Sequence, residues 1–214
     1  MPQKKTQRGK PSEKERLLNI TEYERPLWEQ GLVLGGVDEV GRGPLAGPVM
    51  AACVVLPKEP LLEGINDSKK LSEKRRNALY ESIMKLALGV GIGVCDEKMI
   101  DDINIRQATL QAMRMAVMDA GADFLLVDGV DKAVLSADIP QISIAGGDAR
   151  SYLIGAASIV AKVKRDALMC RLDEEFPQYG FARNKGYGTK EHIEAIRKYG
   201  LCKYHRRCFT GNFV

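Results

Sequence analysis

Short apolar runs recur along the chain and are separated by stretches with helical periodicity. The runs have the length of buried strands, and most are followed by Gly, Asp or Pro residues that end a strand. They occupy residues 32–37, 49–56, 90–94, 124–127 and 141–144. The first two runs flank a Gly-rich turn, so we expect them to be neighbouring strands of one sheet.

Helical stretches fill the intervals between these runs. Ser72 is placed to cap a helix that Gly89 ends, and Thr189 to cap a last helix ending near Gly200. Two further helices are predicted at about 104–120 and at 149–176, the second closed by Pro177. Strands that alternate with helices predict an α/β fold, in which helices pack on the faces of a mixed sheet.

The first thirty or so residues differ from the rest. Residues 1 to about 14 are polar and basic, a composition typical of a mobile tail. Residues 15–30 could form a short helix with one apolar face, although Pro26 interrupts or starts a helix there. We therefore divide the chain into a basic tail and helical extension at 1–31 and a main domain at 32–214, which includes the C-terminal helices.

Composition narrows the class of protein. With 214 residues, of which 45% are hydrophobic, the chain can bury one sizeable core but is short for two full domains. The net charge of +4 mildly favours an anionic partner. The five scattered cysteines do not suggest a disulfide framework, and no apolar run of membrane-spanning or signal-peptide type begins the chain. We expect a cytoplasmic protein with no membrane partner.

Acidic residues follow two of the predicted strands. Asp38 and Glu39 come directly after residues 32–37, and Asp128 follows 124–127. Clustered carboxylates suit Mg²⁺, and two such ions about 3.5–4 Å apart hydrolyse phosphodiesters without a His, Ser or Cys nucleophile. Adjacent residues on a strand point to opposite faces, so either the strand ends there or Glu39 contributes differently. Each acid alone could be an ordinary solvated charge or a helix cap.

A glycine turn follows the acidic pair within two residues. In Gly41-Arg42-Gly43-Pro44, two positions lack side chains, so the backbone can approach a ligand closely. Arg42 adds a guanidinium that suits phosphate. A purely structural turn between two strands is the alternative.

The complete string from Gly36 to Val49, GVDEVGRGPLAGPV, closely resembles the signature of ribonuclease HII. Further blocks resemble that family in the same order over roughly residues 32–209: 66–71 (NDSKKL), 127–129 (VDG), 147–148 (GD), 156–166 (AASIVAKVKRD) and 186–189 (GYGT). The resemblance implies an RNase H-like mixed sheet flanked by helices. It also implies a four-carboxylate site for Mg²⁺ or Mn²⁺, which Asp38, Glu39, Asp128 and Asp148 match.

The fourth carboxylate is open to alternatives, because Asp138 and Asp166 compete with Asp148. We prefer Asp148 for its Gly-Asp context and interpret Asp166 as a structural acid that pairs with Arg or Lys at helical spacing.

The resemblance also implies substrate contacts. The backbone of Gly41, Arg42 and Gly43 would sense the ribose 2′-hydroxyl, the group that distinguishes RNA from DNA, and Tyr187 the following deoxynucleotide. Lys69, Ser158, Lys162 and Arg165 would lie near the phosphate backbone, which positions a duplex without reading its bases. Taken singly, each could be a solvated charge, and Tyr187 a loop aromatic that anchors the chain.

The function implied is that of a monomeric endoribonuclease acting on RNA/DNA hybrids and on DNA duplexes that contain ribonucleotides. It would hydrolyse the RNA strand and cut 5′ of single embedded ribonucleotides by two-metal-ion chemistry, leaving 5′-phosphate and 3′-hydroxyl ends. Ribonuclease HIII is similar but carries a sizeable N-terminal domain, which the residues before Leu32 cannot form. A catalytically silent hybrid-binding module is the alternative from another class.

Two C-terminal features remain. The basic stretch 203–207 (KYHRR) could track a nucleic-acid backbone or be a solvated end of the domain. Cys202, His205 and Cys208 superficially suggest zinc, but no fourth ligand is spaced to match.

Overall fold

The computed structural model describes residues 12–129, 135–136 and 138–213. Its centre is a five-stranded sheet in the order β3-β2-β1-β4-β5. The strands are β1 (Leu34–Val40), β2 (Val49–Val55), β3 (Gly89–Cys95), β4 (Phe124–Asp128) and β5 (Gln141–Ile144). β1 pairs antiparallel with β2 and parallel with β4, so the sheet is mixed, as the sequence predicts.

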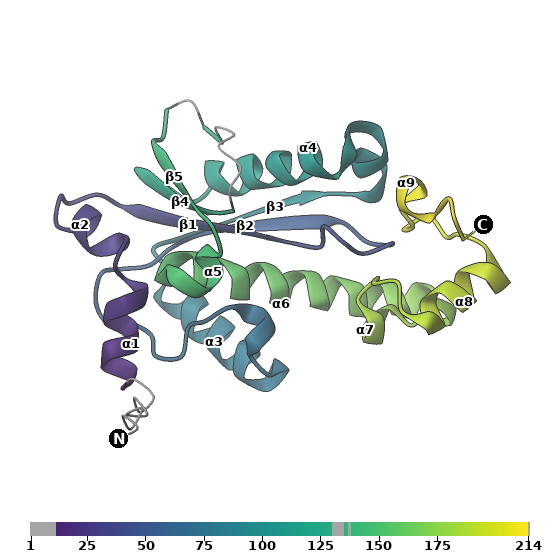
Figure 1. Ribbon diagram of the computed structural model, residues 1–214, viewed down its shortest axis with the longest axis horizontal. Helices are drawn as coiled ribbons and strands as arrows, with labels where there is room; N and C mark the ends of the chain where they lie inside the picture. Colours follow the sequence, from purple (N-terminus) through teal and green to yellow (C-terminus); the bar gives the residue numbers. More distant parts are fainter. Residues whose placement is uncertain (1–11, 130–134, 137, 214) are drawn as a thin grey trace, which may run out of the picture.

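Helices cover both faces of the sheet (Figure 1). Those of the main body are α3 (Glu73–Leu86), α4 (Glu97–Met118), α5 (Gly147–Arg150) and α6 (Tyr152–Glu175). The ends of the chain add α1 (Glu13–Ile20), α2 (Glu24–Trp28), α7 (Phe181–Asn184), α8 (Lys190–Tyr199) and α9 (Arg207–Thr210), and two 3₁₀ turns lie at Ser68–Lys70 and Pro177–Tyr179. Ser72 and Thr189 cap α3 and α8 as predicted, each by accepting a backbone hydrogen bond.

The alternation of side chains along the strands creates two apolar layers. Val37, Cys53 and Leu125 pack towards α4, whereas Leu34, Ala52 and Leu126 pack towards α3 and α6. This alternation also decides which way each acid at the strand ends points.

Close approach of α4 to β3 depends on glycine at every second position of the strand. A Cβ atom added to Gly91 would lie 1.8 Å from the Ala116 carbonyl oxygen, and Gly89 and Gly93 face Ala120 and Ala112 in the same way. Any side chain on this face would push α4 away from the sheet.

Several predicted boundaries are wrong. The helix predicted at 104–120 begins where expected, because the backbone of Asn104 is non-helical and a new segment starts there, but an unpredicted segment from Glu97, capped by Asp96, precedes it within α4. The helix predicted at 149–176 is interrupted at Ser151, whose backbone is extended. The extension at 15–30 forms α1 and α2 instead of one helix, and the tail prediction for residues 1–11 lies outside the described residues.

The extension packs on the main body. Leu17, Tyr23 and Trp28 contact the apolar layer beside α6. None of the helices in the described ranges combines the length and hydrophobicity that a membrane-spanning segment needs.

Candidate active site

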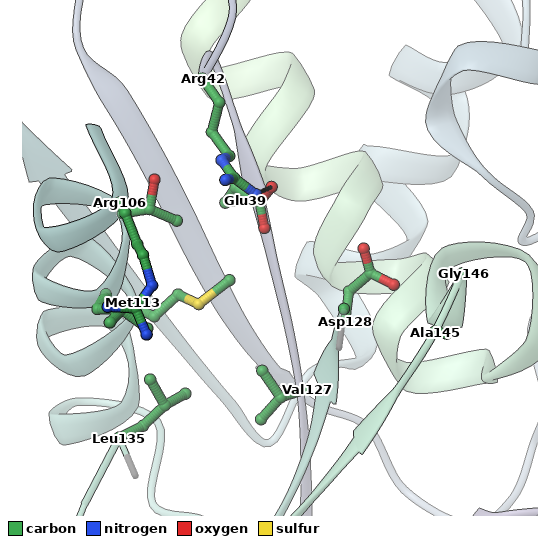
Figure 2. A pocket seen from close by; sticks show the side chains of 12 residues that line it. Glu39, Arg42, Arg106, Met113, Val127, Asp128, Leu135, Ala145 and Gly146 are labelled. Atoms are coloured by element: carbon green, nitrogen blue, oxygen red, sulfur yellow. Dashed lines mark ion pairs between the residues drawn. The ribbon is translucent and has the colours of Figure 1, made fainter. Parts of the chain in front are cut away.

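Three carboxylates meet at one edge of the sheet. Because β1 and β4 are parallel, with Val37 paired to Val127, Asp38 and Asp128 follow at the same end of neighbouring strands. One ligand oxygen from each of Asp38, Glu39 and Asp128 lies within 4.8 Å of the others. In Figure 2, Glu39 and Asp128 border the same cavity.

The two adjacent acids use opposite faces of β1. The strand continues to Val40, so of the two alternatives left open by the sequence, the one in which Glu39 contributes differently from Asp38 holds. Asp38 points to the α6 side, as its cross-strand partner Ala52 does, and Ser158 on α6 lowers the pKa of its carboxyl. Glu39 borders a cavity that α4 lines with Leu110 and Met113. The cluster therefore spans both faces of the sheet edge, which resolves the geometric conflict.

Burial makes this cluster electrostatically unfavourable when it is empty of cations. Burial raises the pKa of Asp38 well above its ordinary value, and the charges of Glu39 and Asp128 raise it further. Burial also raises the pKa of Glu39, while Arg42, with Nη1 3.6 Å from Oε1, lowers it. Within the described ranges, no basic side chain forms an ion pair with Asp38 or Asp128.

These residues fit a hard divalent cation. The donors are carboxylate oxygens, which Mg²⁺ and Mn²⁺ prefer. A cation would also relieve the repulsion that raises the pKa of Asp38. The cluster gathers the first three predicted ligands.

Asp148 lies near the cluster but outside that 4.8 Å group. It sits in the first turn of α5, with Oδ2 4.0 Å from Lys69 Nζ. Burial raises the pKa of Asp148, and the charges of Asp67 and Asp128 add to the effect. The same turn is tied to the cluster, because Gly147 N–H donates to Asp128 Oδ1 at 2.6 Å. Its role as fourth ligand stays a prediction.

The two competitors of Asp148 have other surroundings. Asp138 is exposed. Asp166 accepts from Lys162 at 2.7 Å and from Arg76 at 3.4 Å, so its interpretation as a structural acid is confirmed. Neither belongs to the carboxylate group.

The N-terminal extension supports the α5 turn. Buried Glu24 accepts hydrogen bonds from the Ser151 hydroxyl at 2.5 Å and from Leu153 N–H at 3.1 Å, at the break between α5 and α6. Tyr23 also hydrogen-bonds Arg150. The extension thus holds the segment that carries Asp148.

A second cavity, of about 430 Å³, opens beside the carboxylates along the glycine turn. It is lined by every predicted substrate residue except Arg165: Gly41, Arg42, Gly43, Lys69, Ser158, Lys162 and Tyr187. Tyr187 is 42% exposed, so its ring is accessible, and a Cβ on Gly43 would lie 3.7 Å from it. We call this space the turn cavity.

The structure corrects the prediction for Arg165. Its side chain is fully buried, and its guanidinium donates to the carbonyl oxygens of Pro48, Lys185 and Ala46 at 2.9–3.1 Å. These bonds leave no surface for a phosphate. Arg165 therefore supports the glycine turn from beneath, where a Cβ on Gly41 would come within 2.3 Å of its Nε.

Arg206 has the same role and was missed as a site residue. It is fully buried, and it donates to the carbonyl oxygens of Gly41 at 2.6 Å, Arg42 at 3.0 Å and Gly47 at 2.9 Å. Burial and the charge of Arg165 lower the pKa of Arg206 to about 10. Because Arg206 is buried, it neither contacts a nucleic-acid backbone nor forms a solvated end of the domain, so both interpretations of residues 203–207 are wrong for this residue.

The two histidines form a buried pair next to Arg206. His192 Nδ1 donates to the Tyr187 carbonyl oxygen at 2.8 Å, and its Nε2 lies 3.1 Å from His205 Nε2. His205 Nδ1 in turn accepts from Cys202 N–H at 3.0 Å. Cys208 is exposed, and no metal-ligand group among the described residues includes this segment.

Comparisons with known proteins agree on one family. The sequence profile described as Ribonuclease HII matches residues 35–212. The chain is 51% identical over 202 residues to ribonuclease HII of Acetivibrio thermocellus, covering 93% of this chain and 78% of that protein. With ribonuclease HII of Enterococcus faecalis it shares 49% identity over 207 residues, covering 95% and 80%.

Solved structures show the same fold. The structure of the PCNA:RNase HII complex from Archaeoglobus fulgidus contains a chain that aligns with a TM-score of 0.71 at 26% identity, covering 82% of this chain and 94% of that one. Ribonuclease H2 from Pyrococcus horikoshii aligns with a TM-score of 0.70 at 24% identity, covering 84% and 98%. The latter supports the fold alone.

Proposed function

The chain belongs to the ribonuclease HII family and is an endoribonuclease. From this premise we propose that it hydrolyses the RNA strand of RNA/DNA hybrids and also cuts 5′ of single ribonucleotides embedded in duplex DNA. The products would carry 5′-phosphate and 3′-hydroxyl ends.

The observation that carries this proposal is the juxtaposition of the carboxylate cluster with the turn cavity. Glu39 and Arg42 border both, so a phosphodiester placed at the carboxylates puts one adjoining sugar against Gly41–Gly43. A turn in which two positions lack side chains can bring its backbone to a 2′-hydroxyl that a bulkier loop would exclude.

Asp38, Glu39 and Asp128 would hold two Mg²⁺ or Mn²⁺ ions, with Asp148 as the fourth ligand. When bound, such ions supply charge neutralisation at the phosphate and an activated water. Among the described residues, both histidines are withdrawn into the buried pair, which supports a mechanism without histidine as general base.

The other residues of the turn cavity bind and orient the substrate. Lys69 and Lys162 offer positive charge to the phosphate backbone, although Lys162 also pairs with Asp166. Ser158 lines the cavity beside Asp38 and lowers the pKa of its carboxyl, and Tyr187 presents a ring to the sugar that follows the ribonucleotide. One chain supplies all of these groups, which supports action as a monomer.

The test is cleavage of a duplex with one ribonucleotide in one strand, beside an all-DNA duplex and an RNA/DNA hybrid, in Mg²⁺, Mn²⁺ or EDTA. We expect metal-dependent cutting 5′ of the ribonucleotide and within the hybrid. Cutting of the hybrid alone would remove the assigned role of the glycine turn. No cutting of either substrate with metal present would favour a silent binding module.

A further inference from the structure

A third feature borders the carboxylates on the side away from the turn cavity. It is a cavity of about 440 Å³, and Figure 2 shows Glu39 and Asp128 on one side of it with α4 opposite. The residues that α4 contributes are Arg106, Thr109, Leu110 and Met113. We call it the α4 cavity.

The α4 cavity and the turn cavity lie on opposite faces of the sheet edge. The turn cavity is lined from α6 by Ser158 and Lys162, whereas the α4 cavity is floored by Val127, which packs in the α4-side layer. Glu39 and Arg42 border both cavities. A strand of nucleic acid crossing the carboxylates therefore enters one cavity on each side.

The chemistry of the α4 cavity is suited to a nucleotide. Its floor is apolar, because the side chains of Val127, Leu110 and Met113 line it with only a small part of their surface exposed. Arg42 and Arg106, both exposed, add positive charge where it borders solvent. An apolar floor with cationic groups at its edge accommodates a sugar and an adjoining phosphate.

The backbone of α4 is shaped to present these residues. Asn104 adopts a positive φ of 66°, which is uncommon for a residue other than glycine, and its Oδ1 accepts from Arg106 N–H at 3.0 Å. A new helical segment thus starts just before Arg106. Thr109, Leu110 and Met113 follow Arg106 at helical spacings of three, four and seven residues, so the four side chains share one face.

We propose that the α4 cavity holds the nucleotide on the 5′ side of the cut, and that Arg106 contacts the phosphate 5′ of that nucleotide. This inference rests on the proposed function, which assigns the ribonucleotide on the 3′ side to the turn cavity. A phosphodiester at the carboxylates has one nucleotide on each side, and the α4 cavity continues the path beyond Glu39 and Asp128.

The test measures whether the effects of removing the Arg106 charge and of removing one phosphate charge on the cleavage rate depend on each other. Cleavage rates at subsaturating substrate are measured for the unaltered protein and for Arg106→Met, with a duplex carrying a single ribonucleotide. A matched substrate replaces the phosphate next to the scissile one, on its 5′ side, with an uncharged methylphosphonate. Arg114→Met is the control variant, since Arg114 lies on the same helix but borders a different hollow.

We expect either change alone to lower kcat/KM about 10-fold, and the two together to lower it little further, because they remove the same contact. Arg114→Met should retain the unaltered rate and the full effect of the methylphosphonate. Arg106→Lys should recover part of the loss on the charged substrate alone.

Multiplicative effects of Arg106→Met and the methylphosphonate would overturn the proposal. Coupling to a phosphate further along the strand, or on the 3′ side, would equally overturn the assignment of the cavity. Failure of the proposed function is distinct, because the unaltered protein would then leave the charged substrate uncut.

Discussion

Two groups of charged side chains adjoin the loop from Gly41 to Pro48, and their surroundings are opposite. In the first, Asp38, Glu39 and Asp128 crowd together, and burial, with the charges of Glu39 and Asp128, raises the pKa of Asp38. In the second, Arg165 and Arg206 are fully buried, and their guanidinium groups donate to backbone carbonyl oxygens.

This difference distinguishes charged groups that stabilise the fold from charged groups that serve the reaction. A buried charge whose hydrogen bonds are satisfied holds a backbone in place, and its removal leaves those carbonyl groups without partners. Buried like charges that their neighbours compensate only in part lower stability, and they persist where a ligand completes the compensation. The arginines therefore hold the backbone of the glycine turn in place, and the carboxylates are suited to binding divalent cations.

The largest effect is expected at the carboxylates. Asp38→Asn removes a ligand charge, so cleavage should fall roughly 10³- to 10⁴-fold. The free energy of unfolding in EDTA should stay equal or rise, because repulsion with Glu39 and Asp128 is relieved. Rates and urea titrations of the same preparations measure both. Activity within 10-fold of the unaltered protein would contradict the role of Asp38 in cation binding.

Arg206 should behave in the opposite way. Arg206→Met leaves the carbonyl oxygens of Gly41, Arg42 and Gly47 without their donor, which should lower the free energy of unfolding by about 3–5 kcal/mol. Urea unfolding measures it. Exposed Arg207 offers a matched control, since Arg207→Met should change stability by less than about 0.5 kcal/mol. Equal effects of the two would show that burial of Arg206 is incidental.

Sequence predicted the acidic side of this contrast far better than the basic side. The strand runs and the order of motifs place Asp38, Glu39 and Asp128 at strand ends, and strand pairing alone then brings them together. Arg206 stands in a basic stretch between His205 and Arg207, and nothing local distinguishes it from a solvated arginine. Its burial results from tertiary packing against a loop some 160 residues earlier in the chain.

The errors in the helix boundaries have a similar cause. The second segment of α4 starts at Asn104, whose φ is positive and whose side chain caps it, as the sequence predicts, whereas the segment from Glu97 that precedes it was not predicted. The break at Ser151 depends on Glu24, a residue of the extension more than a hundred positions away. Local propensity carries no information about so distant a partner as Glu24.

The buried histidine pair makes the stability of the fold depend on pH. Its hydrogen bonds require both rings to be neutral, because His192 donates through Nδ1 and His205 accepts there. Burial and the neighbouring His192 lower the pKa of His205 from 6.5 to about 4. As pH falls, the unfolded chain binds the proton first, so stability present above pH 6.5 is lost between about 6.5 and 4.

The expected loss over that range is about 2–3 kcal/mol from His205. Urea unfolding at a series of pH values measures it, and the comparison is with His205→Gln, in which this component of the pH dependence should disappear. An unchanged pH profile in that variant would place the acid sensitivity elsewhere.

Cation binding gives the smallest and most selective test. A ligand that binds the folded state alone raises the free energy of unfolding by about 1.4 kcal/mol at ten times its Kd. Mg²⁺ or Mn²⁺ should therefore stabilise the unaltered protein by roughly 1–2 kcal/mol and Asp38→Asn by clearly less, whereas Arg206→Met, if it folds, should retain a substantial part of the shift. Thermal unfolding with and without EDTA measures these differences. If Asp38→Asn kept the whole increment, the cation would bind away from the three carboxylates, and their crowding would need another explanation.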